Sequence, residues 1–382
     1  MPIDLAMFAD KLQRYCAQFA VTPEEMSRGT GIPLDRLTAF AERRSDPTGD
    51  EVLILADFFM CDFRFFISNE KLASFEQTES LFRLHGEKLT REDRWAIQEF
   101  LFLCECQEFL LSNMLDVKRQ PFAFKKTGKF YKGHGQEAAA ALRKHLGYEF
   151  NQVPKDIYKD LRGIGIHVFR RKLGQSAISG LFVRHPVAGR CVLVNYSQDV
   201  FRQRFTAAHE AGHAILDDEA DFVVSFSVWD RNDLSEVRAN TFASRLLIPP
   251  EFLKAIPDAN GWSQNRLLDW SVRLMVNAEP LAYALKDAGL ITDEQVGSLR
   301  DVTIPRERKS DPELPDSLSP RTRTRKEELL QRGLSDGYVG LCFDGYERGT
   351  ISAGRLAEML LATDSEVAEI AGLYGRRLTH VD

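Results

Sequence analysis

The sequence lacks any run of about 18 consecutive apolar residues, the length that a helix needs to cross a bilayer. Its first residues, MPIDLAMFADKL, carry acids early and place no basic stretch before an apolar one. We therefore expect neither a membrane span nor a secretory signal peptide. We also find no internal repeat, so a repeat architecture is not expected.

Cysteines are few for the length of the chain, and none of them forms a C-x-x-C pair. Scattered cysteines in a chain of 382 residues favour reduced thiols over a disulfide framework. We therefore expect a cytoplasmic protein. The six cysteines are Cys16, Cys61, Cys104, Cys106, Cys191 and Cys342.

An excess of positive charge is also missing, because the formal net charge is −6 at pH 7. Any binding of nucleic acid must therefore come from a local basic patch. Hydrophobic residues make up 44% and charged residues 28%, a composition typical of globular proteins. The length predicts roughly two to four compact units.

The N-terminal part of the chain contains clear helix signals in the stretch VTPEEMSRGTGIPLDRLTAF. Thr22 and Glu25 have the spacing of a capping box, which begins a helix, and Gly29 or Gly31 would end that helix. Pro33 opens a second short helix. Two short helices joined by a tight turn with glycine are typical of a helix-turn-helix unit.

These signals, together with the later PTGDEVLILADFF, resemble the small repressor-type (XRE, or Cro-like) helix-turn-helix domains over residues 1–68. The resemblance implies DNA binding. The second helix, however, offers only Asp35, Arg36 and Thr38 as polar side chains that could read bases. Arg36 is the candidate DNA contact of this part, and a domain used only for protein contact is the alternative.

Residues 69–132 predict a helical connector that ends in a basic and aromatic segment, KRQPFAFKKTGKFYK. Cations interleaved with aromatic rings are typical of surfaces that bind single-stranded nucleic acid. The alternative is a solvated basic loop whose aromatic residues anchor it to the core. The candidate nucleic-acid contacts are Lys118, Arg119, Phe124, Lys125, Lys126, Lys129, Tyr131 and Lys132.

The remaining chain predicts a mainly helical α+β fold with one small sheet. In residues 133–295 a helix closed by Gly147 is followed by β-rich runs in GIGIHVFRRKL, AISGLFVRH and RCVLVNYS, the last two joined as a hairpin. Residues 296–325 are rich in proline and charge and predict a linker. Residues 326–382 predict a small helical C-terminal region.

The stretch FTAAHEAGHAILDD contains His-Glu-x-x-His. On a helix capped at Thr206, His209 and His213 share one face, and two neutral imidazoles there can bind one Zn²⁺. Glu210 could then take a proton from water as the general base. A chance pair of histidines on a helix is the alternative, so a third ligand is the test.

The third ligand does not come from a metzincin pattern, because no His-x-x-Gly-x-x-His continuation follows. Glu236 begins the stretch EVRANTFASRLL, where it shares a helix stripe with small and apolar residues that should face inward. A carboxylate on a buried stripe is costly unless it is paired or binds a metal. Asp217, Asp218 and Glu219 compete for this role, but their place directly after His213 favours solvated charges at a helix end.

The stretch RFTAAHEAGHAIL followed by SEVRANTFASRLLIPP resembles the ImmA/IrrE metallopeptidase family, and the resemblance covers residues 135–290. It implies a gluzincin-like HExxH domain that binds zinc through His209, His213 and Glu236, with Glu210 as the general base. The helical C-terminal stretch GLSDGYVGLCFDGYERGTISAGRLAEMLL is similar to segments seen in some members.

Members of that family typically cleave a helix-turn-helix repressor and so derepress genes for stress, DNA-damage response or phage defence. The repressor-cleaving peptidases of anti-phage operons look similar. The resemblance thus implies a zinc endopeptidase whose protein partner is a small repressor encoded nearby. We expect the substrate to add as a strand to an open sheet edge around Ile178–Val183.

A cytoplasmic peptidase also needs control. Single-stranded DNA at the basic segment is one expected activator, and Cys104 or Cys106 in the fourth position of the zinc is one expected inhibitor. Two other classes of function compete with a peptidase. They are a DNA-binding transcriptional regulator that uses the peptidase fold as a sensor, and a component of a toxin–antitoxin module.

Overall fold

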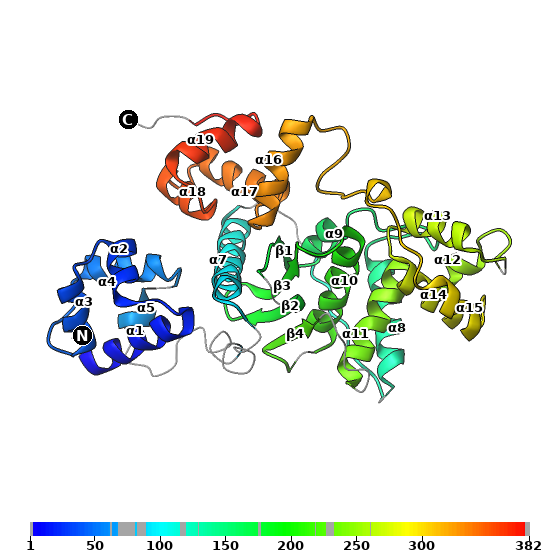
Figure 1. The fold of residues 1–382 in the computed structure, drawn as a ribbon, viewed down its shortest axis with the longest axis horizontal. Helices are drawn as coiled ribbons and strands as arrows, with labels where there is room; N and C mark the ends of the chain where they lie inside the picture. Colours follow the sequence, from blue (N-terminus) through cyan, green and yellow to red (C-terminus); the bar gives the residue numbers. More distant parts are fainter. Residues whose placement is uncertain are drawn as a thin grey trace. The chain divides into compact units, whose positions relative to one another are not determined.

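The computed structural model shows two compact units (Figure 1). The first unit comprises residues 1–102 with 173–176, and the second comprises residues 103–172 with 177–382. The boundary falls inside one helix, α7 (Arg91–Asn113). The structure describes residues 3–61, 63–67, 81, 89–114, 120–128, 130–174, 177–217, 219–226, 233–259 and 261–378.

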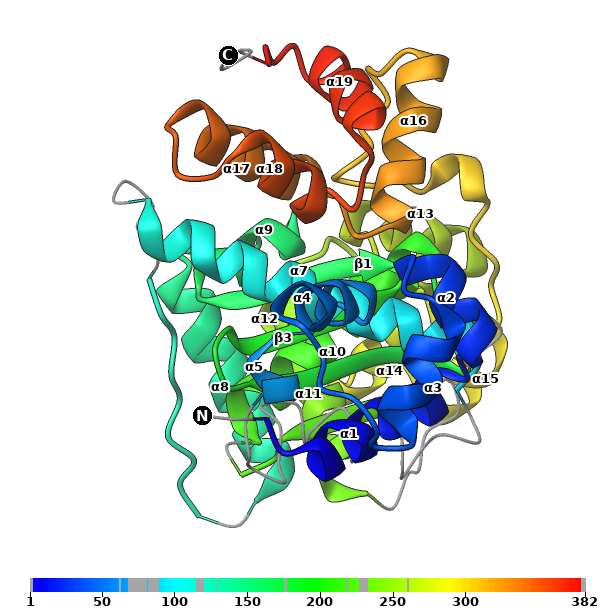
Figure 2. The ribbon, with the colours of Figure 1, turned by 90° about the vertical axis from the view of Figure 1, so that its left-hand side faces the viewer.

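The first unit is helical, and its helices are coloured blue in Figure 2. Its short helix pair forms as the sequence predicts. The capping box of Thr22 and Glu25 begins the first helix of the pair, and Gly31 ends it. The helices are α1 (Leu5–Phe19), α2 (Pro23–Thr30), α3 (Leu34–Ala41), α4 (Gly49–Phe58) and α5 (Arg64–Ile67).

The second unit contains a mixed sheet of four strands in the order β1-β3-β2-β4. The strands are β1 (Ile166–Arg171), β2 (Ile178–His185), β3 (Gly189–Asn195) and β4 (Phe222–Phe226). β1 runs parallel to β3, and β2 is antiparallel to both of its neighbours, as the predicted hairpin requires. β4 was not predicted, and it covers the side of β2 that we expected to be an open edge. That expectation was wrong.

Helices pack on both faces of this sheet (Figure 1). Alternate residues of β2 show the two sides, because Gly180 approaches Glu210 of α10 whereas His185 pairs with Glu105 of α7. The face of α10 holds the main hydrophobic core of the unit. The helices on that side are α8 (Tyr131–His145), α9 (Ile157–Gly163), α10 (Val200–Leu216) and α11 (Leu234–Leu247).

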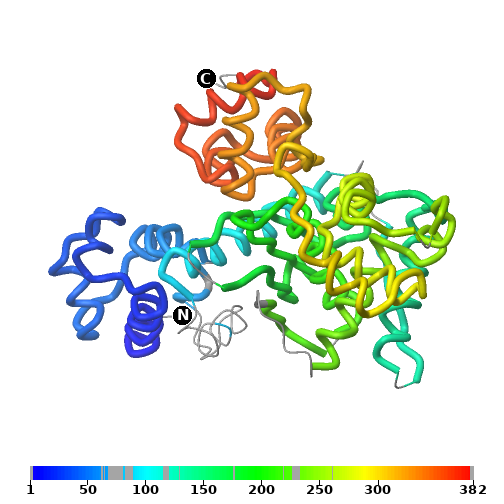
Figure 3. Tube along the Cα trace, turned by 45° about the vertical axis from the view of Figure 1, so that its right-hand side comes forward, coloured from blue at the N-terminus to red at the C-terminus, as the bar shows by residue number. Residues whose placement is uncertain are grey.

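The rest of the second unit is helical, and its last four helices form the orange and red group in Figure 3. Part of the predicted linker contacts the sheet. Asp311 and Glu313 form ion pairs with the buried Arg170 of β1. The helices are α12 (Pro250–Lys254), α13 (Gln264–Leu274), α14 (Ala278–Asp287), α15 (Asp293–Leu299), the short 3-10 helix η2 (Arg306–Arg308), α16 (Pro320–Gln331), α17 (Asp336–Glu347), α18 (Ala353–Met359) and α19 (Asp364–Leu373).

The described part of the chain is therefore mainly helical α+β, and the predicted fold class is confirmed. Within that part, no helix is both long and apolar enough to span a membrane. The boundaries that we expect for the individual domains stay predictions.

Candidate metal centre

The helix that carries the two histidines begins earlier than the sequence suggested. Asp199 caps α10 by accepting hydrogen bonds from the backbone amides of Phe201 and Arg202. Thr206, the predicted cap, lies inside the helix and is buried. The prediction was wrong because Asp199 directly precedes the apolar residues Val200 and Phe201, where its carboxylate satisfies the orphan amides of the first turn.

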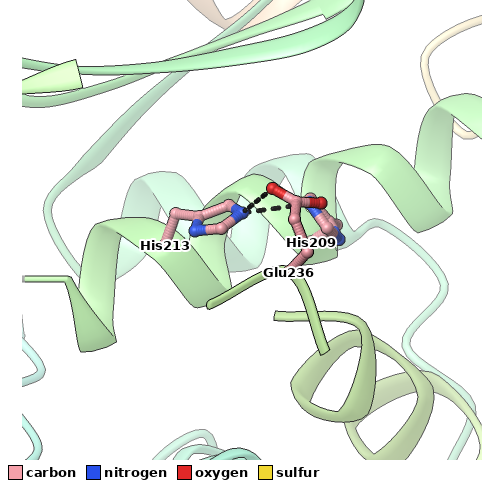
Figure 4. Close-up of side chains that lie close together, drawn as sticks. All are labelled: His209, His213 and Glu236. Carbon is pink, nitrogen blue, oxygen red and sulfur yellow. Dashed lines mark hydrogen bonds and ion pairs between the residues drawn. The ribbon is translucent and has the colours of Figure 1, made fainter. Parts of the chain in front are cut away.

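Three side chains from two helices converge at the middle of α10 (Figure 4). The Nε2 atoms of His209 and His213 lie 3.1 Å apart. Glu236, in the first turn of α11, places one carboxylate oxygen 3.3 Å from Nε2 of His209 and the other 3.2 Å from Nε2 of His213. Among the described residues, this is the group of histidine, cysteine and acidic side chains whose ligand atoms could hold one metal ion.

The outer nitrogens of both imidazoles face oxygen acceptors. Nδ1 of His213 lies 2.6 Å from Oδ2 of Asp217, and Nδ1 of His209 lies 3.0 Å from Oδ1 of Asn240. Each Nδ1 therefore carries the proton, and each Nε2 directs a lone pair into the space beside Glu236. Three electron-pair donors that point at one another repel unless a cation lies between them.

The spacing of these atoms fits such a cation. Two ligands that are each about 2.0–2.1 Å from a tetrahedral zinc ion lie about 3.3–3.4 Å apart. The three separations among His209, His213 and Glu236 are 3.1, 3.2 and 3.3 Å. Two neutral imidazoles and one carboxylate are also a donor set that zinc favours.

The charge of Glu236 suits this role. Burial by itself would raise the pKa of its carboxyl group, but the two histidines outweigh burial and hold that pKa well below its usual range. The carboxyl group of Glu236 therefore stays ionised, as a metal ligand must be.

Glu210 lies on the adjacent side of α10 and is fully buried. Burial raises the pKa of its carboxyl group, and the two histidines and the hydroxyl group of Ser225 act against that rise without cancelling it. Gly180 makes room for it, because a Cβ atom there would lie 2.5 Å from Oε1 of Glu210. The site thus holds a buried carboxylate beside the converging ligands.

The comparison with protein families agrees with this geometry. Residues 162–286 match the Peptidase_M78 family, described as the IrrE N-terminal-like domain. This part of the chain is a Peptidase_M78 domain. No curated protein was found to be similar to the chain. The matched residues contain His209, His213 and Glu236 together with Glu210. A Peptidase_M78 domain with this cluster of metal ligands is a metallopeptidase domain.

The helices of the Peptidase_M78 domain pack closely enough for Glu236 to reach the histidines. Gly212 lies between the two histidines on α10, and a Cβ atom there would be 3.2 Å from the backbone of Ala239 on α11. The glycine of the His-Glu-Ala-Gly-His stretch therefore sets the approach of the two helices. This contact was not predicted from the sequence.

One of the competing acids after His213 has a different role from the one expected. Asp217 is not a solvated charge, because it accepts from His213 and pairs with Arg238, and its side chain is only 11% exposed. The helix period explains this, since residues 213 and 217 lie on one face. Glu219 is exposed, and Asp218 lies outside the described residues.

The two cysteines expected to gate the metal are not at the site. Cys104 and Cys106 are buried on α7, which packs on the opposite face of the sheet. The thiol of Cys104 lies beside Cys191 of β3, and the thiol of Cys106 lies beside Tyr338 of α17. Burial raises the pKa of Cys106 to about 12, which makes it a poor metal ligand near neutral pH.

The candidate nucleic-acid contacts differ in their exposure. Lys125 and Lys132 are exposed, whereas Phe124 packs against the hydrophobic core. Lys126 donates to the backbone carbonyl of Leu216 at the end of α10. Lys118, Arg119 and Lys129 lie outside the described residues.

The other two candidates are in ordered contacts. Tyr131 is partly exposed, and its ring lies under the guanidinium group of Arg238, 5.2 Å from it. Arg36 of the first unit lies 2.7 Å from Glu51 and also covers the ring of Phe40. The guanidinium group of Arg36 is thus held by its own unit.

Proposed function

We propose that this protein is a zinc-dependent endopeptidase that cleaves a partner protein, namely a small helix-turn-helix repressor, and so derepresses genes for stress, DNA-damage response or phage defence. The observation that carries the proposal is the convergence of His209, His213 and Glu236 next to the buried carboxylate of Glu210. A purely structural metal site has no use for that carboxylate.

A zinc ion held by these three residues would supply Lewis acidity, which increases the acidity of water and the reactivity of a peptide carbonyl. The chain's own contribution to proton transfer is Glu210. Its raised pKa suits a group that accepts a proton from water and then donates it to the amide nitrogen of the departing peptide.

The substrate needs an extended surface next to the metal. β4 supports this role, because it is an edge of the four-strand sheet and lies next to β2, whose Gly180 contacts Glu210. A substrate segment can add to such an edge through backbone hydrogen bonds. β4 therefore takes the place that we had expected for residues 178–183.

Activation by single-stranded DNA and a cytoplasmic setting belong to the same proposal. The exposed Lys125 and Lys132 support a basic surface in the segment before α8. Arg36 adds little to DNA recognition, because Glu51 already holds its guanidinium group. A peptidase regulated through the second unit therefore has more support than an autonomous DNA-binding regulator.

The test is incubation of the zinc-loaded full-length protein with the helix-turn-helix protein encoded by the neighbouring gene, with and without single-stranded DNA. We expect cleavage by the wild type and loss of cleavage in Glu210→Gln, with zinc still bound by the variant. Cleavage at the wild-type rate by Glu210→Gln would remove Glu210 from the mechanism. An intact repressor under all conditions would reject it as the substrate.

A further inference from the structure

A chain of contacts extends outward from one metal-binding histidine. His213 donates from Nδ1 to Asp217, and the other carboxylate oxygen of Asp217 pairs with the guanidinium group of Arg238 on α11. That guanidinium group lies over the ring of Tyr131, at the start of α8. The chain Tyr131–Arg238–Asp217–His213 thus joins three helices.

The helix alone does not fix the orientation of the Asp217 side chain, because Asp217 lies at the end of α10. It is the C-terminal cap of α10, with a backbone that is no longer helical (φ −104°, ψ 65°). Arg238, whose side chain is only 8% exposed, holds the carboxylate from the side opposite His213. A charged hydrogen bond in such a buried setting is stronger than one at the surface.

Tyr131 reaches Arg238 because α8 and α11 are in close contact. Gly135 lies one helical turn after Tyr131 on the same face, and a Cβ atom there would be 2.6 Å from the backbone carbonyl of Arg238. The ring therefore covers a guanidinium group that is already close to the helix. Its cation–π contact limits the motion of that group.

The segment before α8 makes a second contact at the same place. Lys126 donates to the carbonyl of Leu216, the last residue of α10 and the neighbour of Asp217. A cation at this position also interacts favourably with the C-terminal end of the helix dipole. Residues 120–128 and 130–131 are therefore attached to the metal site through Lys126 and through Tyr131.

We propose that Arg238 and Tyr131 are positioning residues of the metal site, and that the segment before α8 is thermodynamically coupled to metal affinity through them. The proposal rests on metal binding by His213, as given above. Partners that orient a ligating histidine typically change metal affinity by about 10–100-fold. Because coupling is reciprocal, metal binding must stabilise the segment by the same factor.

The test measures zinc affinity of the full-length protein by competition with a chromogenic chelator. We expect Arg238→Gln to weaken zinc binding by about 10–100-fold, since Asp217 loses its charged partner. Tyr131→Leu should weaken it about 2–5-fold, the size of one exposed cation–π contact. Tyr131→Phe keeps the ring and should bind zinc as the wild type does.

Arg245→Gln is the matched control, because Arg245 is also on α11 but lies 3.9 Å from Asp287 instead of contacting Asp217. Hydrogen exchange of the wild type gives a readout that needs no variant. We expect the backbone amides of residues 120, 122–128 and 130–131 to exchange more slowly with zinc than without it.

The outcomes separate this inference from the proposed function. Unchanged zinc affinity in Arg238→Gln, or exchange in the segment that does not respond to zinc, would overturn the coupling. If the wild type itself binds no zinc, the proposed function fails first. If Arg238→Gln does not fold, the exchange experiment on the wild type decides.

Discussion

Two groups of buried histidines, each with partly buried glutamates, lie on opposite faces of the same sheet. On the face of α10, His209 and His213 share Glu236, and their Nε2 atoms are 3.1 Å apart. On the face of α7, His167 and His185 each have their own partner. His167 lies 3.0 Å from Glu108, and His185 lies 3.1 Å from Glu105.

The residue types are the same, but the arrangements differ in one respect. In the first group the lone pairs converge on one point, which needs a cation. In the second group each imidazole is satisfied locally, and Nδ1 of His185 accepts from the backbone amides of Val187 and Ala188. The second group can hold α7 on the sheet without any metal. Convergence, and not composition, therefore distinguishes a metal site from a packing contact.

The largest expected effect tests this difference directly. Glu236→Gln should weaken zinc binding by more than about 100-fold, because it removes a ligand, and even outer partners cost about 10–100-fold. Glu108→Gln, the matched change in the other group, should leave zinc binding unchanged. Zinc content after dialysis against a chelator, measured by mass spectrometry, checks both. Equal zinc loss in the two variants would mean that the groups are not distinct.

The next effect concerns Glu210. The group of His167 and His185 on the face of α7 has no equivalent of this residue. Gly180→Ala should lower the cleavage rate by about 100-fold, since a displacement of the order of 1 Å at a reacting group has that cost. The added Cβ would lie 2.5 Å from the carboxylate oxygen and 2.6 Å from Cγ2 of Thr206. Zinc affinity should not change. Gly340→Ala, where a Cβ atom meets nothing within 4 Å, is the control.

Much of the metal site could be predicted from the sequence because helix periodicity places residues on faces. His209 and His213 share a face by their spacing, and the stripe of Glu236 faces inward as expected. The same rule could have assigned Asp217, which lies four residues after His213. Its place directly after His213 instead favoured a solvated helix-end charge, because the sequence pattern did not show its partner Arg238, 21 residues away.

Tertiary placement could not be predicted in the same way. A sequence pattern does not specify which face of a sheet a helix covers, so Cys104 and Cys106 were expected near the zinc, whereas α7 lies on the other face. β4 was missed because a strand of only five residues gives little periodicity. Its absence from the prediction made β2 look like an edge strand.

A smaller effect tests the packing role of the α7 group. His185→Leu should lower the free energy of unfolding by about 1–3 kcal/mol, because the amides of Val187 and Ala188 lose their acceptor. His185→Asn offers a side-chain oxygen and should recover part of that loss. Both variants should bind zinc normally. Chemical denaturation with and without zinc checks this, and a loss of zinc affinity in His185→Leu would contradict a purely structural role.

The smallest effect comes from a third buried cluster, in which the chain supplies its own cation. Arg170 is fully buried between Asp311 and Glu313. Burial would raise the pKa of Glu313, but Arg162 and Arg170 outweigh it, so the pKa lies below its usual value. A lowered pKa in the folded state stabilises the protein above the unfolded value of about 4.3, and this stability is lost as the pH falls through the folded value.

Urea unfolding followed from pH 7 to pH 3 should therefore show a loss of stability below about pH 4 in the wild type. Glu313→Gln cannot titrate and should show a smaller loss over the same range. This cluster should not change the free energy of unfolding of either protein near pH 6–7, because it contains no histidine and free imidazoles titrate at about 6.5. An equal acid response in both proteins would show that Glu313 is not ionised in the folded state, and that Arg170 does not hold its carboxylate as a metal ion would hold Glu236.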